Sequence, residues 1–433
     1  MRSVSIGLVL VAAPLLAASA QPRQQGRRAD APCAPDNGGI TLPAGFCATI
    51  FADSVSGARH LTVAPNGDVF VATYGAGRGG VSGGVVALRD TNGDGRADVR
   101  EKFGDFRSSE VALFDGHVYA ENFTAVLRWP IAPGSLVPNG PIDTVVGGLP
   151  GGGHFAKTFT IDRSGALYVN IGSRTNSCQV QDRAPGSPGV DPCTELETRA
   201  GIWKFDARKL NQTQSSGEHF AQGIRNAVAI TINPRDGDVW VMQHGRDNLG
   251  GPAGGNWPAL YTAEQSAESP GEEMFHVQRG DNFGWPYCYF DTELKQKLLA
   301  PDFGGDHKSV ARCATMKGNV TYFPGHWAPN GMLFYTGNML PAKYRDGAFV
   351  AFHGSWNRAP LPQAGYNVVF QPMKDGKPSG KYQVFADGFH REATGAQPMV
   401  NRRPVGLAQG PDGALYITDD SGGRIWKVFY TGR

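Results

Sequence analysis

The stretch PNGDVFVAT at residues 65–73 joins a turn that ends in glycine to a run of β-branched and aromatic residues. The phrase recurs five more times, as FDGHVYAEN (114–122), RSGALYVNI (163–171), RDGDVWVMQ (235–243), RDGAFVAFH (345–353) and PDGALYITD (411–419). Glycine suits such turns because it adopts positive φ angles without strain, and the residues after it are typical of strands. A self-similar unit of this size indicates a β-propeller, and six copies predict six blades.

The spacing of the turn glycines supports one repeated unit. Gly67, Gly116 and Gly165 are separated by 49 residues each, and the later intervals of 72, 110 and 66 residues predict the same unit with insertions. The fifth copy is imperfect, because its aromatic residue stands one place early. We therefore predict an all-β fold, a six-bladed β-propeller with decorated loops over residues 33–433, and a short helix within 259–268 in the longest insertion.

Charge and the N-terminus restrict the function classes. The 433 residues carry a net charge of +2, which gives no footprint for nucleic acid or an anionic membrane surface. Residues 1–20 are predicted to be a cleavable secretory signal, with Arg2, an apolar stretch and a small-residue cleavage site. A membrane anchor is the alternative, but the apolar stretch is short for a stable membrane span. Residues 21–32 then form a disordered leader, and the protein is periplasmic or secreted.

Six cysteines in an exported chain favour disulfides. Six cysteines allow fifteen pairings, of which sequence proximity favours Cys33–Cys47, Cys178–Cys193 and Cys288–Cys313. The chain contains no CxxCH motif, so we expect no attached c-type haem.

The segment DTNGDGRADVRE (90–101) has the spacing of a calcium loop. The oxygen donors at positions 1, 3, 5, 7, 9 and 12 are Asp90, Asn92, Asp94, the Arg96 carbonyl, Asp98 and Glu101. Strands rather than helices flank it, so an ordinary acidic hairpin turn is the alternative. A calcium ion here would be structural, because the loop has no proton donor suited to catalysis.

Several histidines and arginines lie in loops beside the repeated phrase. His154 follows three glycines in GLPGGGHFAKTFTID (148–162), and histidine suits general-base chemistry near neutral pH. Asn226 and His244 are separated by a strand, a turn and a return strand, so both are expected at the same blade end. A surface histidine and solvated strand ends are the alternatives for these residues.

Arginines at the same end would bind an anion. Arg225, Arg358 and Arg403 are expected to bring three guanidinium groups together, and such groups suit carboxylates and phosphates. His326, His353 and Trp356 lie in glycine- and proline-rich loops of similar character. Surface arginines without function are common, so only the joint placement is informative.

These motifs resemble one known family. GIRNAVAITINPRDGDVWV, HGRDNLG, GDNFGWPYCY (280–289), FVAFHGSWNR and RRPVGLAQGPDGALYITDDSGGRIWKV (402–428), together with the His154 segment, are similar to the glucose/sorbosone dehydrogenases. The resemblance runs from about residue 40 to the C-terminus. It implies an exported six-bladed enzyme that uses pyrroloquinoline quinone (PQQ), a quinone with three carboxylates, and Ca²⁺.

The resemblance also implies roles for individual residues. His154 would take the proton from a sugar hydroxyl while hydride passes to the quinone. The implied cofactor contacts are Arg225, Asn226, His244 and Arg403, with Arg358, His326 and Trp356 less closely matched to the family. The carbonyls of Gly245 and Arg246 would bind a second calcium ion. Electrons would pass to an external acceptor, a quinone or a soluble redox carrier.

The chain departs from the family at several of these places. Some relatives have a lysine on the fifth blade, where this chain offers His353, Gly354 and Arg358. Two other classes of function remain open: a calcium-dependent propeller hydrolase such as a sugar lactonase, and a non-enzymatic propeller that binds extracellular partners. The hydrolase would need acidic ligands around a metal-bound water on the axis, and the binding protein would not need His154.

Overall fold

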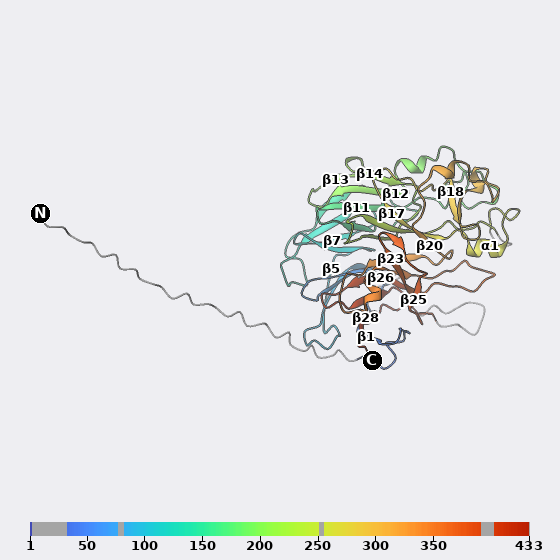
Figure 1. Cartoon of the computed structure of the whole chain (residues 1–433). Helices are drawn as coiled ribbons and strands as arrows, with labels where there is room; N and C mark the ends of the chain where they lie inside the picture. Colours follow the sequence, from blue (N-terminus) through green and yellow to red (C-terminus); the bar gives the residue numbers. More distant parts are fainter. Residues whose placement is uncertain (2–32, 77–81, 251–254, 391–401, 433) are drawn as a thin grey trace.

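Six β-sheets are arranged around a common centre in the computed structural model, which describes residues 1, 33–76, 82–250, 255–390 and 402–432. The chain runs from blade to blade around this centre, and the N-terminal strand ends beside the last one (Figure 1). The predicted six-bladed β-propeller is confirmed. The predicted signal (1–20) and leader (21–32) lie, apart from Met1, outside the described residues.

Each blade has four antiparallel strands that follow one another in chain order, apart from short strands that lie in the connections, and only the last blade takes its outer strand from the N-terminus. The first blade consists of β2 (Ala58–Val63), β3 (Val69–Gly75), β4 (Ser82–Arg89) and β5 (Val99–Phe103). The second consists of β6 (Val111–Phe114), β7 (His117–Glu121), β8 (Val126–Pro130) and β9 (Asp143–Gly147), with β13 (Gln212–Thr213) parallel to β9. The third consists of β10 (Phe159–Ile161), β11 (Ala166–Ile171), β12 (Gly201–Asp206) and β14 (Glu218–Gln222). The fourth blade consists of β15 (Ala229–Ile232), β16 (Val239–Gln243), β17 (Glu272–Val277) and β20 (Thr321–Phe323). The fifth consists of β21 (Pro329–Phe334), β22 (Gly347–Phe352), β23 (Asn367–Lys374) and β25 (Gln383–Ala386), with β24 (Lys377–Pro378) on β23. The sixth consists of β26 (Pro404–Gln409), β27 (Leu415–Asp419), β28 (Ile425–Tyr430) and β1 (Phe46–Ala52).

The remaining elements lie in the connections. They are the hairpin β18 (Cys288–Asp291) and β19 (Gln296–Leu299), the helix α1 (Ala263–Glu268) and the 3-10 turns η1 (Thr194–Glu197), η2 (Gln214–Ser216), η3 (Pro301–Phe303), η4 (Ala311–Thr315) and η5 (Ala342–Tyr344). The predicted helix is present but begins later than residue 259, because the Thr262 side chain accepts the Gln265 backbone N–H and caps it there. Among the described residues, no helix has the length and apolar character needed to span a membrane.

Most of the repeated glycines close the turn between the first and second strands of a blade. Gly67 and Gly413, for example, have φ angles of 96° and 85°, which favour glycine. Gly347 differs, because it begins β22 after a longer connection through η5. A Cβ atom at Gly347 would lie 2.4 Å from the Gln371 carbonyl oxygen and 2.5 Å from the Phe370 ring. The glycine of the fifth copy therefore allows close strand packing instead of a tight turn.

The N-terminal strand closes the ring. β1 pairs with β28 with Ala48 opposite Val428, and so becomes the outermost strand of the sixth blade. All three predicted disulfides are present, and Cys33–Cys47 ties the segment before β1 to this strand. Apolar contacts join neighbouring blades, as where Trp240 of β16 meets Phe334 of β21 edge to face.

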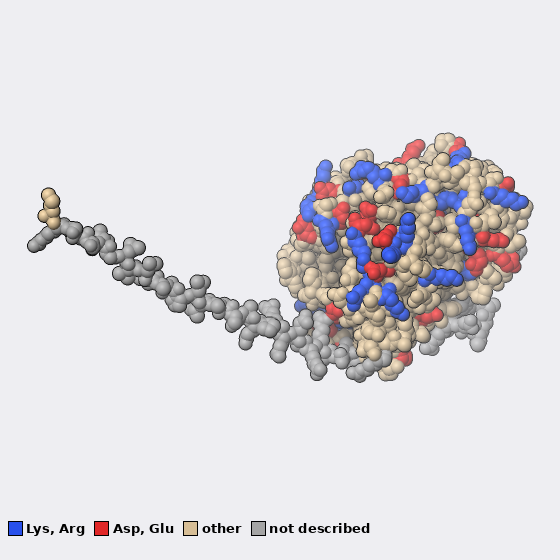
Figure 2. Space-filling view, viewed as in Figure 1, with Lys and Arg blue, Asp and Glu red and all other residues tan. Residues whose placement is uncertain are grey.

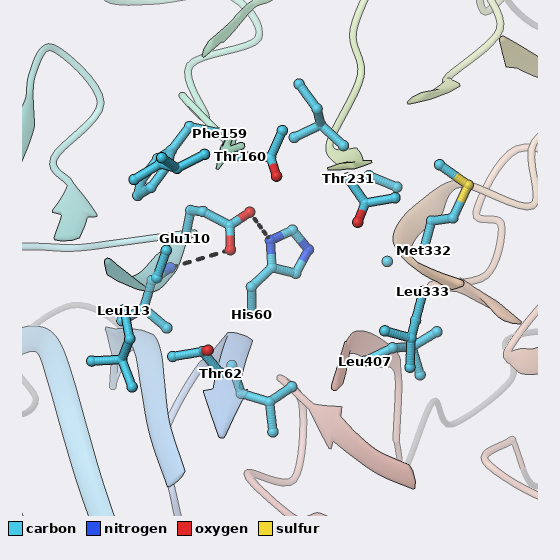
Figure 3. Close-up of a pocket in the computed structure, with 17 residues that line it drawn as sticks. His60, Thr62, Glu110, Leu113, Phe159, Thr160, Thr231, Met332, Leu333 and Leu407 are labelled. Atoms are coloured by element: carbon cyan, nitrogen blue, oxygen red, sulfur yellow. Dashed lines mark hydrogen bonds and ion pairs between the residues drawn. The ribbon is translucent and has the colours of Figure 1, made fainter. Parts of the chain in front are cut away.

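The first strands of the six blades surround the axis. They line a cavity of about 220 Å³ with threonine and aliphatic side chains (Figure 3). His60 lies in this cavity, with Nδ1 2.7 Å from Glu110 Oε2 and Nε2 2.6 Å from the Asn330 carbonyl oxygen. Both side chains are buried, and the pair links the first two blades to the fifth. The axis is therefore narrow and is lined by polar and aliphatic side chains. Several of the predicted histidines and arginines lie at one end of it.

Candidate functional site

Several of the predicted residues lie at the blade ends opposite the turn glycines. His154, Arg225 and Arg403 precede the first strand of blades three, four and six, whereas His244 and His353 follow the second strand of blades four and five. The start of the first strand and the end of the second meet at the same end of an antiparallel pair. The backbone N–H of His244 accordingly donates to the Asn226 carbonyl (2.9 Å).

The His154 imidazole is held in one orientation. Its Nδ1 lies 2.9 Å from the Ser173 carbonyl oxygen and 3.0 Å from Ser173 Oγ. A carbonyl only accepts, so Nδ1 carries the proton and Nε2 is the unprotonated nitrogen. Burial, reinforced by the Arg225 charge, lowers the pKa of His154 to about 3. A Cβ atom at Gly172 would lie 2.6 Å from His154 Cβ and 3.0 Å from Asn226 Oδ1. Gly172 therefore lets the side chains of His154 and Asn226 pack closely against the backbone.

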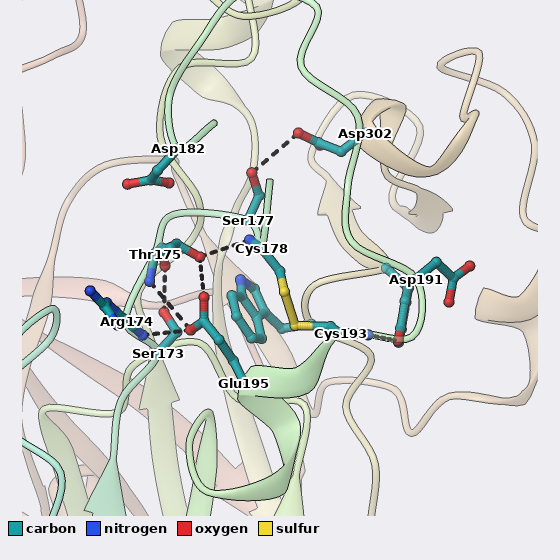
Figure 4. The surroundings of a disulfide bond; sticks show 12 residues. Ser173, Arg174, Thr175, Ser177, Cys178, Asp182, Asp191, Cys193, Glu195 and Asp302 are labelled. Atoms are coloured by element: carbon teal, nitrogen blue, oxygen red, sulfur yellow. Dashed lines mark hydrogen bonds between the residues drawn. A yellow bond between two sulfur atoms is a disulfide. The ribbon is translucent and has the colours of Figure 1, made fainter. Parts of the chain in front are cut away.

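The loop 173–178 that supports His154 is braced from two sides. Glu195 accepts the backbone N–H of Arg174 (2.6 Å) and of Thr175 (3.3 Å), and Thr175 Oγ1 accepts the Cys178 N–H (2.9 Å). The Cys178–Cys193 disulfide joins the same loop to the start of η1 (Figure 4). This insertion of the third blade thus fixes a short polar segment above the strands.

Asp247 neutralises Arg225. The Arg225 guanidinium is buried and lies 3.1 Å from Asp247 Oδ2, and it also donates to the carbonyl oxygens of Asn176 (3.1 Å) and Gly245 (2.9 Å). Arg183 donates to the same Asp247 oxygen (2.8 Å). Burial opposes ionisation, but these cations, Arg225 foremost, hold the pKa of Asp247 well below its usual range.

His326 faces the other carboxylate oxygen of Asp247. Its Nδ1 lies 3.7 Å from Asp247 Oδ1, and its Nε2 donates to the Ser266 carbonyl (2.8 Å). Burial lowers the pKa of His326, but Asp247 outweighs it and the net shift is upward. Asn357 Nδ2 also donates to Asp247 Oδ1 (2.9 Å). The structure therefore brings His326 to the same cluster as Arg225.

The predicted calcium carbonyls lie at the edge of this cluster. The Gly245 N–H donates to buried Glu272 (2.9 Å), whose pKa burial raises to about 7. The Gly245 carbonyl accepts one bond from Arg225 and keeps a second lone pair. The side chain of Arg246 is buried in an ion pair with Asp302, so the backbone carbonyl is the group that Arg246 offers to a metal.

Arg403 lies on the far side of the axis end. It donates through Nε to the His353 carbonyl (3.0 Å) and through Nη2 to the Gly354 carbonyl (2.8 Å). The two sides are joined through the connection before β21, where His244 Nε2 donates to Pro329 O and the His353 N–H donates to Ala328 O. Burial lowers the pKa of His244 to about 4, so this histidine is neutral near pH 7.

A second carboxylate stands beside Arg403. Asp420 follows β27 and accepts from Arg59 Nη1 (2.8 Å) and His353 Nε2 (2.9 Å). Arg59 lies over the Tyr74 ring at 4.8 Å, and its buried Nε has no hydrogen-bond partner among the described residues. Contacts therefore run around the axis end from blade three through blade six to blade one.

Two predicted contacts lie outside this cluster. The Arg358 guanidinium donates to the carbonyls of Ala267 (2.9 Å) and Gly325 (2.7 Å) and pairs with Glu268. These bonds fasten α1 to the fifth-blade loop. Trp356 is 70% exposed at the surface. The structure thus gives Arg358 internal partners and leaves Trp356 facing solvent.

The acidic loop 90–101 is tightly curled. Asp90 accepts the N–H groups of Gly93 (2.7 Å) and Gly95 (2.8 Å), and Asp98 accepts from Thr91. Glu101, the last of the predicted donors, lies on β5. In the described part of the chain, the one group of three His, Cys, Asp or Glu ligand atoms within 4.8 Å of one another is Asp236, Asp238 and His276. The carboxylates of 90–101 are not gathered that closely, and the calcium loop stays a prediction.

Sequence reasoning missed the partners of the predicted residues. They are Arg59, Tyr74, Asn176, Asp247, Glu272 and Asp420. Asp420 stands just after the second strand of its blade, as His353 does, so its place in the repeat was a signal. Arg59 lies within β2, whereas Arg403 precedes β26, so the repeat did not mark Arg59. Asp247 lies within HGRDNLG, but its role depends on Arg183 and His326 from distant insertions.

Comparisons with known proteins agree with this architecture. A family model described as TrAA12-like matches residues 40–431. The pyrroloquinoline quinone-dependent pyranose dehydrogenase of Coprinopsis cinerea is 26% identical over 453 residues, covering 94% of this chain and 55% of the relative. The aldose sugar dehydrogenase of Escherichia coli is 22% identical over 278 residues, covering 64% and 60%. The chain thus spans little more than half the length of these curated relatives.

Solved structures carry the same fold. The holo form of the pyranose dehydrogenase PQQ domain from Coprinopsis cinerea superposes with a TM-score of 0.72 at 21% identity, over 90% of this chain and 97% of that one. This likeness concerns the fold, and the family assignment rests on the match over residues 40–431. The chain belongs to the TrAA12-like family of PQQ-dependent sugar dehydrogenases, which have the six-bladed propeller fold.

Proposed function

We propose that this protein oxidises an aldose or a sorbosone-type sugar with PQQ and Ca²⁺, and that it passes the electrons to an external quinone or soluble redox carrier. The observation that carries the proposal is the state of His154. Its Nδ1 donates to the Ser173 carbonyl and its pKa is lowered to about 3, so Nε2 is an unprotonated base throughout the neutral range. This nitrogen would accept the proton of a sugar hydroxyl as hydride leaves the sugar carbon.

The donor set at the axis end suits a ligand with several carboxylates. The Arg403 guanidinium is bonded only to carbonyl oxygens in the described residues, and the buried Arg59 Nε lacks a partner there. Arg225, Asn226 and His244 would contact the cofactor from blade four, and the carbonyls of Gly245 and Arg246 would hold calcium. When bound, PQQ with its calcium ion would supply a two-electron oxidant for the sugar.

The protein's own residues set the proton chemistry. Ser173 fixes the His154 tautomer, and the braced loop 173–178 fixes the position of the ring. The proton that His154 accepts at Nε2 is then released to solvent. The loop 90–101 would bind a structural calcium ion away from this chemistry.

Export is part of the proposal. Three disulfides are typical of oxidising compartments, and residues 1–20 would direct the chain to the periplasm or the medium. Residues 33–433 would then be one catalytic domain. Figure 2 shows acidic and basic side chains interspersed on the visible face of the molecule, in keeping with a small neutral substrate.

The hydrolase alternative is less well supported. It requires acidic ligands around a metal-bound water, whereas Asp247 and Asp420 each already lie between two cationic or histidine partners. A non-enzymatic propeller that only binds partners would not need an oriented, unprotonated histidine beside the arginines.

The test is reconstitution of the apo-protein. PQQ and CaCl₂ are added, and reduction of an artificial dye is followed with a panel of aldoses. Dye reduction that depends on the sugar, on PQQ and on His154 is expected. No reduction with any sugar, together with no cofactor absorbance after dialysis, would overturn the proposal.

A further inference from the structure

Three aromatic side chains from three blades meet beside His154. The Phe123 ring, which follows β7, lies 4.6 Å from Phe155 and 5.6 Å from Tyr74, measured between ring centroids. Phe155 is 39% exposed, and Tyr74 and Phe123 are half-buried. Arg107 is exposed and places its guanidinium 4.6 Å from the Tyr74 centroid. We call Tyr74, Phe123 and Phe155 the aromatic platform.

Two buried charged residues, Glu121 and Lys157, support the platform. Glu121 accepts the N–H of Phe123 (2.6 Å) and the N–H of Ser109 (2.7 Å), and Ser109 Oγ lies 2.6 Å from the Tyr74 hydroxyl. Lys157 donates through Nζ to the Phe155 carbonyl (2.8 Å). Glu121 and Lys157 are fully buried. Glu121 therefore holds Phe123 directly and Tyr74 through Ser109, and Lys157 holds Phe155.

Burial of these two charges is costly. It raises the pKa of Glu121 to about 7, partly offset by its N–H donors, and lowers the pKa of Lys157 to about 8. A buried acid and base of this kind are weak stabilisers, because desolvation offsets their attraction. Apolar side chains would fill this space at lower cost. The buried Glu121 and Lys157 are explained if their role is to fix the position of the exposed rings.

The platform and the base face different ways. The His154 ring is turned toward Ser173 and the Arg225 side, whereas the next residue, Phe155, packs against blades one and two. A sugar carbon delivered to His154 therefore does not occupy the platform. Phe155 directly follows His154 in the chain, so the platform begins at the residue next to the base.

We propose that the aromatic platform binds the second pyranose ring of an oligosaccharide whose reducing-end sugar lies at His154. The apolar C–H face of that ring would stack on Phe155 and Phe123, and its hydroxyl rim would meet the Arg107 guanidinium. Glu121 and Lys157 are positioning residues for the platform. This inference rests on the proposed function for the identity of the reacting end, but the binding of the second ring does not depend on PQQ.

The first experiment uses the apo-protein, so that oxidation plays no part. Isothermal titration with methyl β-cellobioside and methyl β-maltoside measures binding of sugars that cannot be oxidised at the anomeric carbon. At least one is expected to bind, and Phe155→Ala is expected to weaken it roughly 10-fold, as for a lost contact of about 1.4 kcal/mol. Phe155→Tyr keeps a stacking ring and should restore binding. Unchanged affinity in Phe155→Ala, or no binding of either glycoside, would overturn the platform.

The second experiment uses the reconstituted enzyme. Phe155→Ala and Phe123→Ala should raise KM for cellobiose or maltose roughly 10-fold and leave KM for glucose within about 2-fold. Leu294→Ala removes an exposed apolar side chain of the β18–β19 connection, 48% exposed, and is the matched control for both sugars. Equal effects on the disaccharides and glucose would contradict a second-ring site. Absence of any dye reduction would overturn the proposed function, while glycoside binding by the apo-protein would still stand.

Discussion

The two sides of the axis end hold their arginines in different ways. On the blade-four side, Arg225 lies 3.1 Å from Asp247, so its charge is neutralised within the protein. On the blade-six side, Asp420 is bonded to Arg59 and His353, and within the described residues Arg403 donates only to the carbonyls of His353 and Gly354. Among the described residues, no carboxylate oxygen lies within 4.0 Å of the Arg403 guanidinium.

This difference separates two tasks. The blade-four side has balanced charge and a base in a fixed tautomer, which suits proton transfer. In the part of the chain that the structure describes, the blade-six side presents a cation without a direct counter-ion, which suits the anchoring of a carboxylate. If the chemistry and the anchoring are divided in this way, substitutions on the two sides have different effects.

The largest effect is expected from His154→Ala. Loss of a general base lowers kcat by about 10²–10⁴-fold, and PQQ affinity should hardly change because the anchoring charge lies on the other side. Steady-state dye reduction and titration of the apo-protein with PQQ measure the two quantities. The pKa of His154 is lowered to about 3, so kcat/KM should stay high as pH falls to about 5 and decline only as His154 becomes protonated. Loss of PQQ binding together with turnover would contradict the division.

Asp247→Asn should strongly destabilise the apo-protein. Removal of one partner of a buried ion pair typically costs about 3–5 kcal/mol, and Arg225 and Arg183 both lose their counter-charge here. Urea unfolding measures the loss. The double variant Arg225→Met/Asp247→Asn should recover part of the stability, because no unpaired charge from this pair is then buried. No recovery would mean that Asp247 acts mainly through its other partners.

The disulfide Cys178–Cys193 offers a test that affects one side only. Its 15-residue separation and the 14-residue separation of Cys33–Cys47 predict a similar stability loss of about 3 kcal/mol when either is replaced by alanines. Only the first pair braces the loop that holds His154. Cys178→Ala/Cys193→Ala should therefore lower kcat at a temperature where both variants are folded, and Cys33→Ala/Cys47→Ala should not. Equal kcat values would show that the loop is held without the bridge.

Arg403→Met is expected to weaken PQQ binding while the apo-protein stays stable. A charge-assisted hydrogen bond contributes about 1.5–3 kcal/mol, or roughly 10–100-fold in affinity. Arg358→Met is the matched control, because its guanidinium is bonded to Glu268 and to backbone carbonyls away from the cluster. That variant should lower the unfolding midpoint and leave PQQ affinity unchanged. If Arg358→Met weakened PQQ binding and Arg403→Met lowered the unfolding midpoint instead, the roles given to these two arginines would be wrong.

The sequence predicted the fold well because each blade repeats a local signal. A glycine that needs positive φ, followed by strand residues, marks the turn between the first two strands, as at Gly67 and Gly413. Distance from that glycine also placed His154, Arg225 and Arg403 at one end. These features depend on neighbours in the chain, so a single sequence contains them.

The charge partners were harder to predict, because they come from insertions far apart in the sequence. Arg183 and Arg225 meet at Asp247 from two different blades. Arg358 has the same local character as Arg403, yet it contacts Glu268 and Gly325 of other insertions. Nothing in the local sequence distinguishes an arginine that is neutralised internally from one that remains available to a ligand.

The smallest effect concerns the histidines that face the two carboxylates. The net pKa shift of His326 is upward, because Asp247 outweighs burial, whereas burial and the nearby Arg403 and Arg59 charges lower the pKa of His353 despite Asp420. A raised pKa adds stability that is complete below the unfolded value of about 6.5 and disappears as pH rises through the folded value. A lowered pKa has the opposite sign, since stability falls as pH drops from about 6.5 toward the folded value. In urea unfolding of the apo-protein, the destabilisation by His326→Gln should therefore grow between pH 8 and pH 6, while that by His353→Gln should shrink. Parallel pH profiles would mean that the two carboxylates have equivalent surroundings, and the contrast between Arg225 and Arg403 would lose its electrostatic basis.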